Sequence, residues 1–157
     1  MHVLSEFSLI LIILVSIMFA TLFSMIGLST PGWFFHEYRH LFCDQCSKAP
    51  SILSVISIML LIICIILLIL LLVKIINEDH VIFIRCLIPF LLFLINIFLL
   101  TSLASYLNFV NSTHGYSYYL TIIAFLFAYF ASLLAVLWLA HGGLISKTYS
   151  IEILLDK

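Results

Sequence analysis

The stretch ILSVISIMLLIICIILLILLLV, Ile52 to Val73, decides the fold because it is a long apolar run without a charged residue. A helix that crosses the hydrocarbon core of a bilayer needs about 20 residues of this kind. Three further apolar runs occur along the chain: Phe7 to Leu28, Cys86 to Leu107 and Tyr118 to Ala140. The sequence therefore predicts an all-α integral membrane protein, a single domain over residues 1-157 with four transmembrane helices.

The composition points to the same class of protein. Of the 157 residues, 66% are hydrophobic and only 8% are charged, which is too few charges for the surface of a soluble domain. The Lys and Arg residues are scattered, so the chain has no basic patch for nucleic acid. We expect its partners to be the lipid bilayer and other membrane proteins, further copies of itself included, and not nucleic acid.

The positions of the basic residues predict the topology. One side of the four runs carries Lys74, Arg85, Lys147 and Lys157, and the other side carries Arg39 and Lys48. Because basic residues concentrate in cytoplasmic loops, both termini are expected in the cytoplasm. Residues 29-50 and 108-117 then form two extracellular loops of a protein in the plasma membrane.

A glycosylation motif agrees with this topology. The sequon Asn111-Ser112-Thr113 lies in the second predicted extracellular loop, the kind of exposed position where such an acceptor is used. We predict a sugar on Asn111.

The interior of the predicted spans contains no Asp, Glu, Lys or Arg. Ionisable residues within the membrane usually mark the pathway of an ion or a proton. A pump or a secondary transporter is therefore disfavoured.

Small residues at four-residue spacing predict where the helices contact each other. These residues are Ser16, Ala20 and Ser24 in the first span and Ala124, Ala128 and Ser132 in the fourth. Small side chains let two backbones approach closely in lipid, so we expect both stripes to be packing faces. Asn96, midway along the third span, is expected to hydrogen-bond to a neighbouring helix, because an unpaired amide is costly in lipid.

The stretch STPGWFFHEYRHLFCDQCSKAPS, Ser29 to Ser51, gathers polar, aromatic and cysteine residues in the first extracellular loop. Cys43 and Cys46 form a C-x-x-C, whose spacing to His36 and His40 would suit zinc. Thiols outside the cell tend to oxidise, however, and we expect no metal. The pair is then either redox-active or a disulfide that fixes a short turn.

The aromatic residues of the same loop have a separate role. Trp33, Phe34, Phe35 and Tyr38 are expected to anchor the loop at the outer membrane interface, where amphipathic rings prefer to lie.

Two short motifs resemble the claudin and peripheral-myelin-protein superfamily, notably its short nematode members. TPGW, Thr30 to Trp33, follows the first span and precedes two loop cysteines, and GYSYYL, Gly115 to Leu120, opens the fourth span. The resemblance extends to the four spans, to a larger first and a smaller second extracellular loop, and to cytoplasmic termini. It implies a compact left-handed four-helix bundle with a role in cell contact or barrier formation, or as an auxiliary subunit of another membrane protein.

The chain also departs from the family pattern in ways that narrow the expected role. Its first loop is short, so one or two short β-strands are expected there at most. The C-terminal Leu-Asp-Lys lacks the apolar end that a PDZ scaffold captures. A structural, cell-contact or membrane-organising role at a cell junction is therefore favoured over the sealing role of a claudin.

These observations lead to one expected function and two alternatives. We expect a claudin-like, non-enzymatic four-span protein that needs no cofactor, with Cys43 and Cys46 joined in a disulfide. The first alternative is a membrane thiol oxidoreductase that uses the same cysteines with a quinone, although the second extracellular loop has no cysteine to relay the electrons. The second alternative is an auxiliary subunit of a channel or receptor complex.

Overall fold

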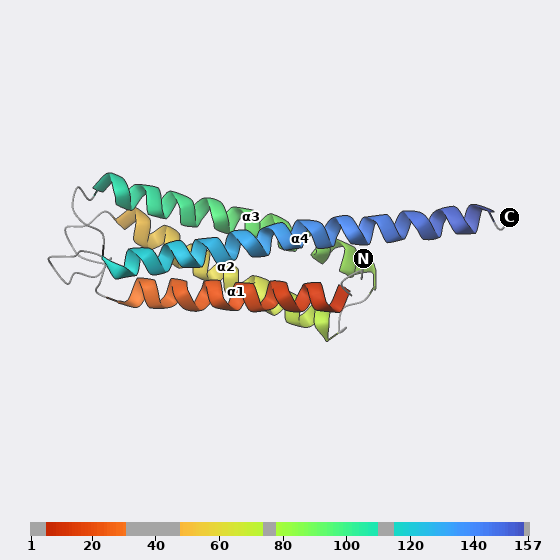
Figure 1. Cartoon of the computed structure of the whole chain (residues 1–157), viewed down its shortest axis with the longest axis horizontal. Coiled ribbons are helices and arrows are strands. Elements are labelled where there is room, and N and C mark those ends of the chain that lie inside the picture. The colour runs from red at the N-terminus through yellow and green to blue at the C-terminus, as the bar shows by residue number, and fades with distance from the viewer. Residues whose placement is uncertain (1–5, 31–47, 74–77, 110–114, 156–157) are drawn as a thin grey trace.

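The computed structural model describes residues 6–30, 48–73, 78–109 and 115–155. They form four helices, α1 (Glu6–Ser29), α2 (Lys48–Leu72), α3 (Glu78–Phe109) and α4 (Tyr116–Leu155) (Figure 1). Each helix contains a segment long and apolar enough to cross a membrane. The predicted all-α four-helix membrane fold is confirmed. The described residues contain no strand, and the first loop, where one or two short strands were expected, lies outside them.

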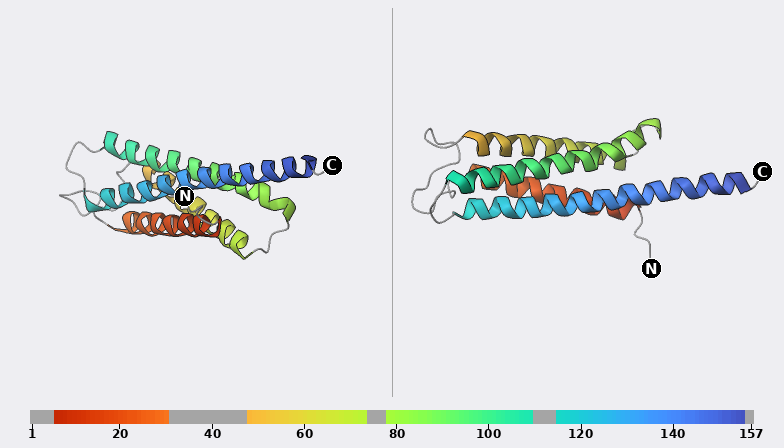
Figure 2. Two further views of the ribbon diagram at one scale, coloured as in Figure 1. Left: turned by 45° about the vertical axis from the view of Figure 1, so that its right-hand side comes forward. Right: turned by 90° about the horizontal axis from the view of Figure 1, so that it is seen from above.

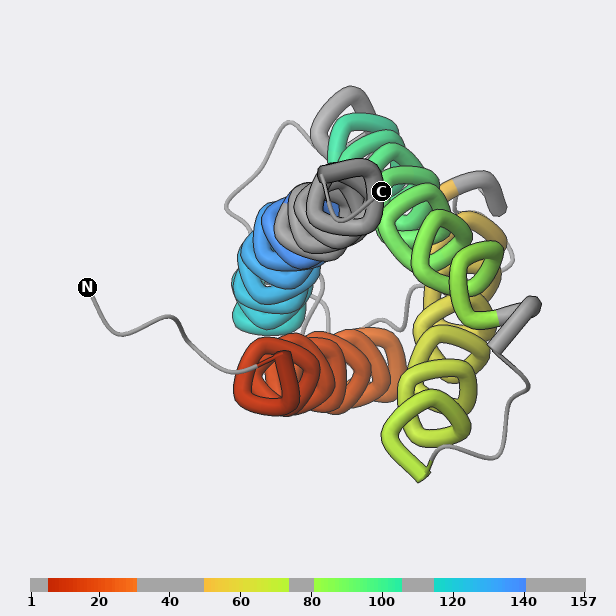
Figure 3. Tube along the Cα trace, turned by 90° about the vertical axis from the view of Figure 1, so that its right-hand side faces the viewer, coloured from red at the N-terminus to blue at the C-terminus, as the bar shows by residue number. Residues whose placement is uncertain are grey.

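The four helices form a ring in which each helix packs on two others. α1 lies between α2 and α4, and α3 lies between the same two helices on the opposite side (Figure 3). The diagonal pairs α1/α3 and α2/α4 have no backbone contact within the described ranges. Successive helices run in opposite directions, so α1 begins at the end of the bundle where α4 leaves it (Figure 1). We call this the Glu6 end and the opposite end the Gly27 end.

The buried residues of each helix recur at alternating spacings of three and four. Such a 3.5-residue repeat keeps one stripe of a helix facing its neighbours only when the helices coil around each other with a left-handed twist. On three of the helices this inner stripe consists of Ile10, Ile13, Ile17, Ala20, Ser24 and Gly27 in α1; Ile88, Leu92, Ile95, Leu99 and Ser102 in α3; and Ser117, Thr121, Ala124, Ala128, Ala131, Ala135 and Trp138 in α4.

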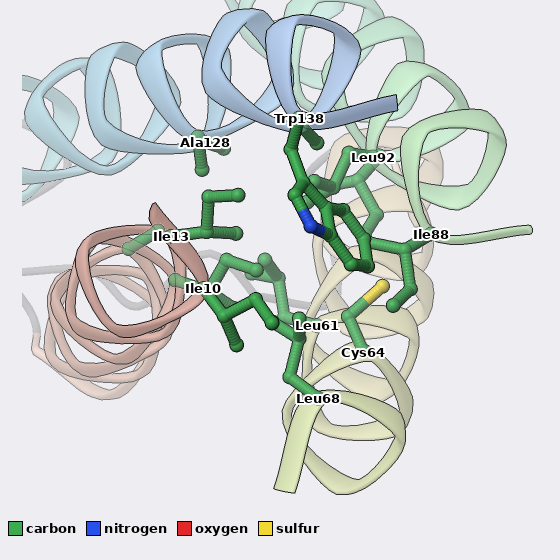
Figure 4. Close-up of a cluster of buried hydrophobic side chains, with 14 of the residues drawn as sticks. Ile10, Ile13, Leu61, Cys64, Leu68, Ile88, Leu92, Ala128 and Trp138 are labelled. Atoms are coloured by element: carbon green, nitrogen blue, oxygen red, sulfur yellow. The ribbon is translucent and has the colours of Figure 1, made fainter. Parts of the chain in front are cut away.

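The interior changes character from one end of the bundle to the other. Toward the Glu6 end it is filled by large apolar side chains, with the indole of Trp138 pointing inward from α4 among Ile13, Ile88 and Leu92 (Figure 4). Toward the Gly27 end the buried side chains are mainly hydroxyls, among them Ser24, Ser54, Ser102, Ser117 and Thr121. Large aliphatic groups therefore pack one half, and short polar groups hold the other half together.

The outer surface of the bundle is apolar on every helix. Exposed side chains include Met18 on α1, Ile66 on α2, Phe93 on α3 and Leu126 on α4. In water such a surface would be unstable, but in a bilayer it meets lipid chains of the same polarity.

Two helices extend further than the apolar runs of the sequence. α3 begins at Glu78, ahead of the run that starts at Cys86, so that Arg85 lies inside the helix. α4 has 40 residues, of which the membrane-length segment Tyr116–Ala140 has 25. The remainder continues as a helix beyond the Glu6 end of the bundle (Figure 2).

Candidate functional site

A charged cluster connects three helices at the Glu6 end. Nη2 of Arg85 on α3 donates to both carboxylate oxygens of Glu6 on α1, at 3.1 and 3.2 Å. The same guanidinium lies over the ring of Trp138 on α4, with its central carbon 5.1 Å from the ring centroid. Since α1 and α3 lie on a diagonal without backbone contact, the long Arg85 side chain provides the link between them.

The burial of this cluster increases from the carboxylate to the indole. The side chains of Glu6 and Arg85 are 41% and 21% exposed, whereas Trp138 is fully buried. Glu6 lies in the first turn of α1, where its negative charge also interacts favourably with the helix dipole. The cation of the cluster thus lies between an exposed anion and a buried aromatic ring.

Two donors of the cluster keep unused hydrogen-bonding capacity. Nε of Arg85 and Nε1 of Trp138 are both buried and have no hydrogen-bond acceptor among the residues that the structure describes. Within the described residues Glu6 accepts from Nη2 alone, and the guanidinium does not make there the two-pronged contact that gives the strongest arginine–carboxylate pairs. The arrangement joins the helices electrostatically.

The sequence contained a signal for this cluster that an analysis of apolar runs overlooks. Arg85 precedes Ile88 by three residues and Glu6 precedes Ile10 by four, so both continue the inner stripe of their helix. Extending the 3.5-residue repeat beyond each apolar run would have placed these charges toward neighbouring helices. In the topology prediction, Arg85 instead counts among the basic residues of a cytoplasmic loop.

The helices α1 and α4 approach each other closely at the Gly27 end. A Cβ atom built on Gly27 would lie 2.8 Å from Oγ1 of Thr121 and 3.2 Å from the carbonyl oxygen of Ser117. The first distance is shorter than real Cβ contacts allow. Only glycine therefore fits this position without a shift of the Thr121 side chain or of one of the two helices.

The small residues singled out in the sequence lie along the same helix pair. Ser16, Ala20 and Ser24 are buried on α1, and Ala124 and Ala128 are buried on α4. Ser132 is half-buried, and Ala131 and Ala135 occupy the next positions of the α4 inner stripe. The stripe on α4 thus follows alternating spacings of three and four instead of a strict spacing of four.

Hydroxyl groups join the helices in pairs at the Gly27 end. Oγ1 of Thr30, just after α1, and Oγ of Ser117 on α4 lie 2.6 Å apart. Oγ of Ser102 on α3 donates to the carbonyl oxygen of Pro50 on α2 at 2.8 Å, and Oγ of Ser54 lies 2.8 Å from Ser102. Because the single proton of Ser102 goes to Pro50, Ser54 must be the donor to Ser102. The contact between Thr30 and Ser117 joins α1 to α4, and the contacts of Ser102 join α2 to α3.

Asn96 on α3 makes its stronger hydrogen bond within its own helix. Its Nδ2 donates to the carbonyl oxygen of Leu92 at 2.8 Å, and a longer contact of 3.5 Å reaches the carbonyl oxygen of Ala128 on α4. Its Oδ1 is buried and finds no donor in the described part of the chain. The amide therefore adds little specificity to the contact between α3 and α4.

The two cysteines in the described ranges are both free. Cys64 is buried on α2, and Cys86 is exposed on α3. No group of three His, Cys, Asp or Glu residues that could hold a metal ion occurs within the described residues. Cys43, Cys46, Asn111 and the four aromatic residues Trp33, Phe34, Phe35 and Tyr38 lie outside these residues.

Comparisons of the chain with protein-family models, with curated proteins and with solved structures found no match.

Proposed function

We propose that this chain is a non-enzymatic, claudin-like four-span protein that organises other proteins laterally in the plasma membrane, with the Glu6 end in the cytoplasm. The contact between Thr30 and Ser117 carries the proposal. Thr30 is the first residue of the TPGW motif and Ser117 the third of GYSYYL, and their hydroxyl oxygens lie 2.6 Å apart. The described residue of the first motif, Thr30, therefore meets the second motif at Ser117, where α1 ends and α4 begins.

The design of the bundle supports a structural role. Its helices are fastened to one another at both ends, by hydroxyl contacts at Gly27 and by the Arg85 cluster at Glu6. Its outer faces are apolar and remain available to lipid or to the helices of a partner. A bundle whose helices are joined at both ends and whose outer faces are apolar suits a protein that acts by binding neighbours in the membrane. Helices associate in lipid by close packing and a few hydrogen bonds.

Face-specific crosslinking in native membranes tests this function. A photoreactive amino acid replaces Met18, Ile66, Phe93 or Leu126, one exposed position on each helix, and the buried Ile13 serves as the control position. We expect a crosslinked adduct of discrete mass from one face and none from Ile13. An adduct to a channel or receptor chain would identify the auxiliary-subunit role. Adducts to lipid alone from all four faces would contradict the proposal.

The competing oxidoreductase is tested on the same membranes through the loop cysteines. The pair is first reduced to two thiols, and alkylation read by mass then reports whether added quinone re-oxidises Cys43 and Cys46 to a disulfide while it is itself reduced to quinol. We expect quinone not to speed the return of the disulfide, and we expect a sugar on Asn111. Passage of electrons from this pair to quinone would overturn the non-enzymatic role.

A further inference from the structure

We propose that two copies of the chain associate in the membrane through the outer face of α4 around Tyr129, and that the Tyr129 hydroxyl hydrogen-bonds to the same hydroxyl of the second copy. The proposal does not depend on the proposed function, because two copies can associate whether or not they bind other proteins.

Tyr129 lies near the middle of the membrane-length segment of α4, Tyr116–Ala140. At 1.5 Å per residue, its backbone is about 20 Å from the first residue of that segment and about 17 Å from the last. The side chain is 50% exposed. Its ring stacks on that of Phe125 in the same helix, with the ring centroids 6.2 Å apart and an angle of 25° between the planes. The hydroxyl is therefore presented to the hydrocarbon core, too deep for the side chain to reach the headgroups on either side.

The Tyr129 hydroxyl has no hydrogen-bond partner among the residues that the structure describes. Lipid chains offer no acceptor at this depth, and a polar group without a partner is costly in an apolar medium. Tyr116 and Tyr119 on α4 are exposed as well, but they lie in the first turns of the span, where tyrosine hydroxyls reach headgroups and water. Of these three tyrosines, only Tyr129 needs a partner from another chain.

A second copy of the chain supplies such a partner at the right depth. Two copies inserted in the same direction are related by a twofold axis along the membrane normal, so a residue near that axis meets its own counterpart. A tyrosine hydroxyl is both a donor and an acceptor, and the two Tyr129 hydroxyls therefore satisfy each other with one hydrogen bond. A different membrane protein would need an acceptor placed independently at the same depth.

The side chains around Tyr129 allow two α4 helices to pack side by side. Leu126, Leu133 and Val136 are all exposed, at positions three before, four after and seven after Tyr129. These spacings place the four residues on one side of the helix, with the repeat found in seams between helices that cross at about 20°. Because these side chains are not buried by α1 or α3, the bundle does not have to open for the second copy to bind.

Dilution of the whole protein in phosphatidylcholine liposomes tests the role of the hydroxyl. The fraction of dimer is measured by single-molecule photobleaching at decreasing ratios of protein to lipid. Interhelical hydrogen bonds in membranes contribute about 0.6 to 1.7 kcal/mol, and 1.4 kcal/mol corresponds to a factor of ten. We therefore expect Tyr129→Phe to raise the dissociation constant about 3- to 18-fold.

Tyr119→Phe is the matched control, since it removes the same atom from an exposed tyrosine of the same helix and should leave the dissociation constant unchanged. A parent chain that is monomeric at every ratio would overturn the proposal, as would equal dissociation constants for the parent chain and Tyr129→Phe. Either result would leave the proposed function standing, because no other protein is present in these liposomes.

Crosslinking in native membranes tests which face of the chain is used. A photoreactive amino acid replaces Leu133 or Val136, so that Tyr129 is kept, and Ile56 on α2, also exposed, serves as the control position. We expect an adduct of twice the chain mass from Leu133 and Val136 and none from Ile56. Adding Tyr129→Phe should lower the yield at both positions. Adducts from Leu133 and Val136 that contain only lipid or only a different protein would overturn the proposal.

Discussion

The hydroxyl oxygens of Thr30 and Ser117, 87 positions apart in the sequence, lie 2.6 Å from each other where α1 ends and α4 begins. Oγ1 of Thr30 already donates to the carbonyl oxygen of Ile26 at 2.9 Å. Ser117 has a second acceptor as well, since its Oγ also donates to the carbonyl oxygen of Thr30 at 3.4 Å, and either hydroxyl can donate in the contact between them. Because the contact joins one side chain beside each helix, it is suitable for a double-mutant cycle.

We expect Thr30→Val and Ser117→Ala each to weaken the bundle, and their effects to be non-additive. Hydrogen bonds between helices in membrane proteins contribute about 0.6 kcal/mol on average and up to about 1.7 kcal/mol, so a coupling energy in this range is predicted. The measurement is the free energy of unfolding in mixed micelles of a mild and a denaturing detergent. Ser29→Ala is the matched control, since Ser29 is exposed and bonds only within its own helix. Additive effects would show that the contact contributes nothing.

Gly27→Ala is predicted to separate α1 from α4 at this end. The new Cβ would meet Oγ1 of Thr121 at 2.8 Å and the carbonyl oxygen of Ser117 at 3.2 Å, and overpacking of this kind costs about 1–3 kcal/mol. The same unfolding assay measures the loss. Adding Thr121→Ala should recover part of it, because the nearer of the two atoms belongs to a side chain. Ser16→Ala, on the same stripe of α1, adds no bulk and should change stability little. Equal stability of Gly27→Ala and the parent chain would mean that the helices are farther apart than described.

The hydrogen bonds between α2 and α3 predict which of two substitutions, Ser102→Ala or Ser54→Ala, lowers the free energy of unfolding more. Ser102→Ala removes both the donor to Pro50 and the acceptor of Ser54, whereas Ser54→Ala removes only the second bond. We expect a loss of about 1–2 kcal/mol for Ser102→Ala and about half of that for Ser54→Ala, at the usual strength of hydrogen bonds in membranes. Thr101→Ala is the control, because Thr101 is exposed and donates only to Ile97 in its own helix. The reverse order would show that Ser54 has a partner other than Ser102.

The four spans could be predicted from the sequence because lipid leaves the chain few choices. In the hydrocarbon core every backbone polar group must be satisfied within the segment, so a long apolar run forms a helix almost irrespective of its neighbours. The helix over Ile52 to Val73 can therefore be predicted from its apolar run alone. The expectation that first and fourth spans carry packing faces rested on small residues, and α1 and α4 do pack on each other in the structure.

Other features depend on contacts that no local pattern specifies. The close approach at Gly27 requires the register between α1 and α4. Arg85 continues the spacing of the inner stripe of α3, but that spacing separates it from the loop cations only if the helix extends beyond the apolar run, as it does from Glu78. The extension of α4 past Ala140 has no long apolar run to indicate it. These features arise where helices meet or leave the membrane, and there the length of an apolar run carries no information.

Arg85 has two partners, and this predicts that its loss is more damaging than the loss of Glu6. Glu6→Gln removes one exposed ion pair, for which about 0.2–1 kcal/mol is typical. Arg85→Gln removes the same pair and the cation over Trp138, which adds about 0.5–2 kcal/mol. Arg85→Lys keeps the charge but loses the planar group that stacks on the ring, so its effect should lie between the other two. Unfolding free energies at low and high salt separate these contributions, since salt screens the exposed pair more than the buried stack. Equal losses for Glu6→Gln and Arg85→Gln would mean that Trp138 contributes nothing to the cluster.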